Sequence, residues 1–210
     1  CARIEAYSKV PFKDPDEETF KRALEGDYII ERGGDQDSEK WSPYDPDGSG
    51  LMRDQKDAGI AVSIIQPIDW GMMSFKGTEW HEESPIPIED INKACADLAT
   101  KHPGKVYYYC GVDPRRPIAV KLFEKAVTEW GAKGLKLYPP CGFYPHDPKC
   151  YRLYQKALDL GVPVLLHLAS SSWMRASRSR PMWIEDVAID FPDLNIIIAH
   201  SGMQIRSDNA

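Results

Sequence analysis

The chain has 210 residues, enough for one hydrophobic core but fewer than the about 250 residues of a complete eight-stranded β/α barrel. Hydrophobic residues make up 42% of the sequence and the net charge is −6, which argues against a disordered chain and against a nucleic-acid-binding protein with a basic face. No apolar run approaches the about 18 residues of a membrane span, and no basic segment followed by an apolar one opens the chain, so neither a membrane protein nor a signal peptide is predicted.

Short β-type runs alternate with helical patterns along the chain. The runs predicted as strands are residues 2–8, 60–66, 106–112, 134–138, 162–168 and 194–200. The patterns predicted as helices are residues 17–24, 51–58, 88–102, 118–130, 148–160 and 184–190. Repeated β/α units indicate a parallel sheet covered by helices. We therefore expect an α/β fold of the TIM-barrel type, as a single domain over residues 1–210. It is an incomplete barrel in which six strands are recognisable and strands seven and eight are not.

Two histidines close apolar strands. His167 ends the run Val-Pro-Val-Leu-Leu-His, and His200 ends Ile-Ile-Ile-Ala-His. In a barrel both would face the mouth at the carboxyl ends of the strands, where enzymes of this fold build their active sites. Imidazole there can bind a divalent metal or exchange a proton. One such histidine is more often structural, but two in matching positions favour metal binding by both and a catalytic role for His200.

Lys136 lies within Gly-Leu-Lys-Leu-Tyr, an otherwise apolar strand. A buried unpaired charge is costly, so its side chain must reach a charged partner or the barrel mouth. It could hold an anionic substrate, act as a base, or bridge metals as a carbamate; the alternative is a lysine that extends its ammonium group to solvent. We predict a catalytic role for Lys136 and a substrate-binding role for Tyr138 at the end of the same strand.

An arginine-rich loop follows the His167 strand and contains Arg175, Arg178 and Arg180 among serines. Guanidinium groups bind carboxylates and phosphates through paired hydrogen bonds, so the loop is predicted to bind an anionic small molecule. A solvated basic loop is the alternative. Asp113, which closes the strand at 106–112, is a further candidate for the mouth, although an Asp before Pro is also a common turn residue.

Several segments resemble the amidohydrolase-related (amidohydrolase 2) family over about residues 50–203. They are Asp57-Ala-Gly-Ile60, Trp130-Gly-Ala-Lys-Gly-Leu-Lys-Leu-Tyr-Pro139, Gly161-Val-Pro-Val-Leu-Leu-His167 and Phe191-Pro-Asp-Leu-Asn-Ile-Ile-Ile-Ala-His200. The resemblance implies a barrel that holds one divalent metal, usually zinc or manganese. It also implies hydrolysis of small amides, esters or lactones, or non-oxidative decarboxylation of aromatic and related acids. By the resemblance, His167 matches the strand-five metal ligand and His200 the strand-six histidine.

The sequence departs from the family pattern at both ends. The first strand of the family ends in a His-x-His metal pair, and here Tyr7 and Lys9 fall at those positions. The last strand of the family supplies an Asp, often within Gly-Ser-Asp. Ser207-Asp208 is similar to that run but lies only eight residues past His200, too close for a further strand, helix and strand.

Three functions stay open on this reading. The first is a metal-dependent hydrolase of a small anionic substrate. The second is a decarboxylase of an aromatic or unsaturated acid, for which the loop from Trp70 to Trp80 would suit an aromatic ring. The third is a barrel that has lost its metal and only binds a ligand. We also expect self-association into a homo-oligomer, and the odd number of cysteines without a C-x-x-C pair favours free thiols and a cytoplasmic location.

Overall fold

The computed structural model describes residue 45 and residues 47–69, 86–169 and 176–202. The chain divides into two compact units, residues 1–60 and residues 61–210. The predicted strand at 2–8 and the predicted helix at 17–24 lie outside the described residues. That the whole chain forms one domain stays a prediction.

The first unit contributes one described helix, α3 (Ser49–Asp57), close to the predicted range 51–58. The carboxylate of Asp45 begins it, accepting the backbone N–H groups of Gly50 at 3.0 Å and Leu51 at 2.8 Å. These are donors that the first turn of a helix leaves without an intrahelical partner. Gly59 follows the helix with a positive φ of 66°, which ends it where the sequence predicts.

The second unit contains six strands and four α-helices among its described residues. The strands are β1 (Ser63–Ile65), β2 (Val106–Tyr108), β3 (Cys110–Gly111), β4 (Leu135–Leu137), β5 (Val164–His167) and β6 (Ile196–Ala199). The helices are α4 (Ile88–Lys101), α5 (Ala119–Thr128), α6 (Pro148–Leu160) and α7 (Glu185–Asp190). Each lies within, or within one residue of, a predicted run, so the alternation of strands and helices is confirmed.

All the strand pairs are parallel, in the orders β1-β2 and β3-β4-β5-β6. The single strand predicted at 106–112 is divided into β2 and β3, because its first half pairs with β1 and its second half with β4. Tyr109 lies between the halves and donates its N–H to the carbonyl of Ile65 at 3.0 Å. Such a stagger between neighbouring strands is what a tilted barrel sheet requires.

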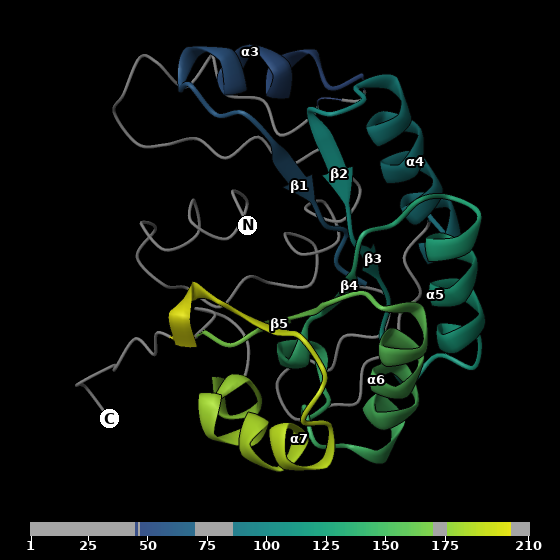
Figure 1. Cartoon of the computed structure of the whole chain (residues 1–210), viewed down its shortest axis with the longest axis vertical. Helices are drawn as coiled ribbons and strands as arrows, with labels where there is room; N and C mark the ends of the chain where they lie inside the picture. Colours follow the sequence, from purple (N-terminus) through teal and green to yellow (C-terminus); the bar gives the residue numbers. More distant parts are fainter. Residues whose placement is uncertain (1–44, 46, 70–85, 170–175, 203–210) are drawn as a thin grey trace, which may run out of the picture. The chain divides into compact units, whose positions relative to one another are not determined.

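Helices α4, α5 and α6 lie along one face of the strands (Figure 1). Leu135 and Leu137 of β4 are fully buried in a cluster with side chains of α5 and α6. Because side chains alternate along a strand, Lys136 points to the opposite face. Its register partner on β5 is Leu165, which in turn pairs with Ile197 on β6, and Ile197 is 39% exposed.

The α/β class and the parallel sheet are therefore confirmed. Within the part of the chain that the structure describes, the strands run from β1 to β6 without closing into a complete barrel. None of the described helices is long and apolar enough to cross a bilayer.

Candidate functional site at the carboxyl ends of the strands

His167 and His200 come together at the ends of the neighbouring strands β5 and β6. The register pairs His167 with Ala199, so His200 follows directly at the edge of the sheet. Nε2 of His200 lies 3.2 Å from Nδ1 of His167, and the ring centroids are 4.6 Å apart at 70°. His167 is buried and His200 is exposed, so the pair runs from the interior to the surface.

The chain leaves β6 through a left-handed turn. His200 has a φ of 58° and Ser201 a φ of 52°, and neither is a glycine. Residues other than glycine rarely adopt this backbone conformation, which costs about 1–2 kcal/mol per residue. Strain of this kind often gathers at functional sites, because the surrounding structure must hold it in place. Here the strained turn is what brings the His200 ring against His167.

The His167 imidazole is held neutral. Burial, followed by the charges of Lys136 and His200, lowers its pKa to about 2. Its Nε2 atom is buried and has no hydrogen-bond partner among the described residues. Buried polar atoms are nearly always paired, so the partner of this nitrogen lies outside the residues that the structure describes.

Lys136 faces a small pocket beside this pair. It is 3% exposed, and burial lowers its pKa to about 7. Its Nζ atom lies 5.9 Å from the centre of the Tyr138 ring, and that ring lies 4.4 Å from the His167 ring. Asp69 and Asp113 line the pocket together with Lys136 and Tyr138. Two predicted site residues, Lys136 and Tyr138, thus lie next to the histidine pair.

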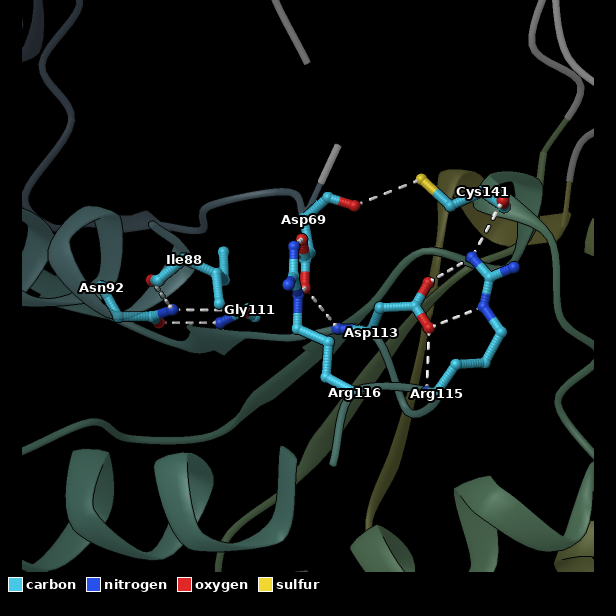
Figure 2. A network of polar contacts seen from close by, with 8 residues as sticks. All are labelled: Asp69, Ile88, Asn92, Gly111, Asp113, Arg115, Arg116 and Cys141. Carbon is cyan, nitrogen blue, oxygen red and sulfur yellow. Dashed lines mark hydrogen bonds and ion pairs between the residues drawn. The ribbon is translucent and has the colours of Figure 1, made fainter. Parts of the chain in front are cut away.

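Two buried ion pairs form a network of polar contacts (Figure 2), and their carboxylates, Asp69 and Asp113, line the pocket. Asp69, after β1, accepts hydrogen bonds from Nε of Arg116 at 2.6 Å and from Nη2 at 2.8 Å. Its Oδ2 also accepts the backbone N–H of Asp113 at 2.9 Å. Asp113, after β3, binds Nε and Nη2 of Arg115, each at 2.8 Å. Both arginines therefore place their charge against a carboxylate.

The same network reaches the loop after β4. Nη2 of Arg115 donates to the carbonyl of Cys141 at 3.1 Å, and the Cys141 thiol lies 3.6 Å from the carbonyl of Asp69. Burial raises the pKa of the Asp113 carboxyl, and the hydrogen bonds and charge of Arg115 oppose that shift. The network thus joins three strand ends at the rim of the pocket.

Sequence reasoning found Asp113 but missed Asp69, Arg115 and Arg116. The signal that could have found them is the run Asp-Pro-Arg-Arg-Pro at 113–117, directly after a strand, with Asp69 directly after another. A charge cluster at strand ends predicts pairing across the mouth, but the partner of each arginine depends on the fold.

The three predicted arginines of the loop after β5 differ in their surroundings. Arg178 is half-buried, with its Cζ atom 5.8 Å from the centre of the Tyr144 ring. Arg180 is exposed. Arg175 lies outside the described residues, as do Tyr7, Lys9 and Asp208. For these four residues the predicted roles stay predictions.

The histidine pair fits a divalent metal as two of its ligands. Zinc binds imidazole nitrogen at about 2.0–2.1 Å, so two nitrogens of one tetrahedral ion are about 3.3 Å apart. The separation of 3.2 Å between the ring nitrogens of His167 and His200 is close to that value, and without an ion the two rings are hydrogen-bonded to each other. A neutral imidazole is the form that binds a metal. Among the described residues, no group of three or more His, Cys, Asp or Glu side chains is placed so that it could hold a metal ion.

Comparison with known families places the site within a matched region. The family model Amidohydro_2, described as amidohydrolase, matches residues 69–209. That range includes both histidines, Lys136 and the arginine loop. No protein of curated function matches the sequence.

Solved structures resemble the chain in fold. Two are of 5-carboxyvanillate decarboxylase from Novosphingobium aromaticivorans with manganese and a hydroxymethoxynitrobenzoic acid bound. Each is 17% identical with a TM-score of 0.62, over 81% of this chain and 55% or 54% of that one. A TIM-barrel protein from Bordetella bronchiseptica is 19% identical, with a TM-score of 0.52 over 76% of this chain and 51% of its own length. The chain thus spans about half the length of these barrels, and the likeness confirms the TIM-barrel class.

Proposed function

This chain belongs to the amidohydrolase family, and on that premise we propose that it is a metal-dependent hydrolase of a small anionic amide, ester or lactone. The observation that carries the proposal is the close pair of His167 and His200, with ring nitrogens 3.2 Å apart at the ends of adjacent strands. The neutral, buried ring of His167 supports it, because a neutral imidazole is the form that binds a metal.

The two histidines would hold zinc or manganese. Because His167 is buried and His200 is exposed, we expect them to have different roles. When bound, the ion would supply Lewis-acid polarisation of a substrate oxygen. His167 is buried and neutral, which suits a permanent ligand. His200 is exposed, so its ring can also exchange a proton with solvent or substrate.

Lys136 and the arginines would bind and orient the substrate. Lys136 is buried beside the pocket with a pKa of about 7, so near neutral pH it can donate or accept a proton. Arg175, Arg178 and Arg180 follow the His167 strand, and a guanidinium suits a substrate carboxylate. Tyr138 lies between Lys136 and His167 and would form part of the substrate surface.

Non-oxidative decarboxylation is the second candidate, and one finding favours it. The decarboxylase from N. aromaticivorans that shares this fold carries manganese and a benzoic acid. In that reaction the cations of this chain would orient the departing carboxylate, and His200 or Lys136 would deliver a proton to carbon. The two reactions differ in product, because only the second releases carbon dioxide.

The test is metal analysis of the purified chain followed by product analysis. We expect about one equivalent of zinc or manganese, lost in His167→Ala and kept in His102→Ala, a histidine at the end of α4. Lactones, amides and aromatic acids would then be screened for hydrolysis and for carbon dioxide release. Turnover that disappears in His167→Ala supports the proposal. Absence of metal from the unaltered chain would contradict it and would favour a barrel that only binds a ligand.

A further inference from the structure

Arg178 is a half-buried cation without a carboxylate partner in the described part of the chain. Its guanidinium lies 5.8 Å from the centre of the Tyr144 ring, an aromatic face that holds a cation but does not neutralise it. The residue belongs to the loop after β5, whereas Tyr144 belongs to the loop after β4. The guanidinium is thus held between the loops that follow two neighbouring strands.

A second guanidinium reaches the same point. A Cβ atom at Gly142 would lie 2.7 Å from Nη1 of Arg115 and 2.8 Å from Nη1 of Arg178. The two Nη1 atoms are therefore within about 5.5 Å of each other, a distance at which like charges repel. Gly142 has a φ of 139°, so both the backbone and the space there require glycine. Its neighbours Cys141 and Phe143 line the pocket.

Arg115 and Arg178 differ in whether a carboxylate neutralises their charge. Arg115 is neutralised by Asp113 through two hydrogen bonds of 2.8 Å, and Arg116 is neutralised in the same way by Asp69. Arg178 has no such counterpart among the described residues. An anion bound at Arg178 would supply the counter-charge that Asp113 and Asp69 supply to the other two arginines.

The surroundings of Arg178 suit a ring-bearing anion. Tyr144, His146 and Trp183 form an aromatic cluster, with ring centroids 5.3 to 5.6 Å apart. Nδ1 of His146 is buried there without a partner among the described residues, which leaves a polar contact for a ligand. Aromatic rings beside an unneutralised guanidinium offer a surface for the ring and a partner for the charge.

We propose that Arg178, held against Tyr144 and given room by Gly142, binds the carboxylate of an aromatic acid. This inference deepens the proposed function, because it assigns the anionic part of the substrate to one residue of the loop. It also makes Gly142 a residue that determines specificity, since any side chain there would push both guanidinium groups away.

The experiment is titration of the full-length chain with benzoate and with benzamide, its neutral analogue, followed by calorimetry. Arg178→Gln is compared with Arg178→Lys and with Arg152→Gln, which removes the same charge from an exposed position on α6. We expect Arg178→Gln to weaken benzoate binding at least tenfold and Arg152→Gln less than twofold. Benzamide affinity should change less than twofold in every variant. Arg178→Lys should lie between the two, and it replaces Arg178→Gln as the decisive variant if the latter does not fold.

The titrations are done on metal-free and on manganese-loaded protein, which separates this inference from the proposed function. Loss of benzoate affinity in Arg178→Gln supports the inference even if the chain proves to bind no metal and turn over no substrate. Benzoate affinity that stays within twofold in Arg178→Gln overturns it, even if metal binding and turnover are found. An unaltered chain that does not bind benzoate, or an equal loss of inorganic phosphate affinity in Arg178→Gln, also overturns the assignment to a carboxylate.

Discussion

Nε2 of His200 lies 3.2 Å from Nδ1 of His167, although 33 residues separate them in the chain. The contact depends on parallel pairing of β5 with β6, which sets Ala199 opposite His167, and on the left-handed turn that begins at His200. Two imidazoles so placed are able to share one ion or one proton.

If the histidine pair holds a metal ion, substitution of either histidine should lower the affinity for that ion. His200→Ala removes one of the two ring nitrogens and should weaken manganese binding by more than the about 10-fold that loss of an outer-shell partner typically costs. His167→Ala should weaken it at least as much, because His167 is buried and neutral. Calorimetric titration of metal-free protein with manganese chloride measures both, and His102→Ala is the control. Equal affinity in all of these variants would show that the ion, if bound, is held elsewhere.

The buried ion pair of Asp69 and Arg116 predicts a large loss of stability on removal of one partner. The side chains are only 5% and 13% exposed, so Asp69→Asn leaves Arg116 desolvated without its counter-charge. The expected decrease in the free energy of unfolding is about 3 kcal/mol, measured by urea denaturation followed by tryptophan fluorescence.

The matched control for Asp69 is Asp97→Asn on helix α4. Asp97 pairs with Lys93, but both side chains are about half exposed or more. Exposed pairs contribute little, so the change should stay within about 0.5 kcal/mol. Similar effects of the two substitutions would mean that burial of the Asp69 pair carries no special weight.

Lys136 predicts a pH dependence of stability. Burial lowers its pKa from 10.5 to about 7, so the folded protein releases a proton that the unfolded chain keeps up to pH 10.5. The penalty for burying Lys136 is therefore complete below about pH 7 and disappears as the pH rises toward 10.5. Lys136→Met should raise the free energy of unfolding by on the order of 3 kcal/mol at pH 6, and by progressively less at pH 8, 9 and 10.

The control for Lys136 is its exposed neighbour on the sequence, Lys133. Urea denaturation of Lys133→Met at the same pH values should give a nearly constant difference from the unaltered protein. A difference for Lys136→Met that does not shrink with pH would show that the lysine is charged in the folded state.

Gly111 predicts a steric limit at the strand ends. A Cβ atom there would collide with the carbonyl of Pro67, which is backbone and cannot move aside as a flexible side chain could. The buried side chain of Asn92 also binds both the N–H and the carbonyl of Gly111, at 3.0 Å and 2.8 Å (Figure 2). Gly111→Ala should lower the free energy of unfolding by about 3 kcal/mol or more.

Gly131→Ala provides the comparison for Gly111. Gly131 has a φ of 75° and no atom within 4 Å of the added Cβ, so only backbone strain opposes the change. The expected loss is about 1–2 kcal/mol in thermal or urea unfolding. If Gly111→Ala proved no worse than Gly131→Ala, the strand ends would be more loosely packed than the distances indicate.

The sequence by itself determined the local elements and the residue types at their ends. Apolar runs and helical spacing follow from contacts within a few residues, so the strand ending at His167 and the helices from α3 to α7 were predictable within one to three residues. The matching positions of His167 and His200 were visible for the same reason. The division of the strand at 106–112 was not, because it depends on which neighbour each half of the strand pairs with.

Only the tertiary structure decided which charges meet. Asp69 and Arg116 are 47 residues apart, and no local pattern distinguishes Arg116, paired with Asp69, from Arg115, paired with Asp113. The same holds for Arg178, whose convergence with Arg115 on Gly142 requires three loops to reach one place. Partners of this kind are chosen by the register and stagger of parallel strands, which bring distant strand ends together while leaving neighbours in sequence on different faces.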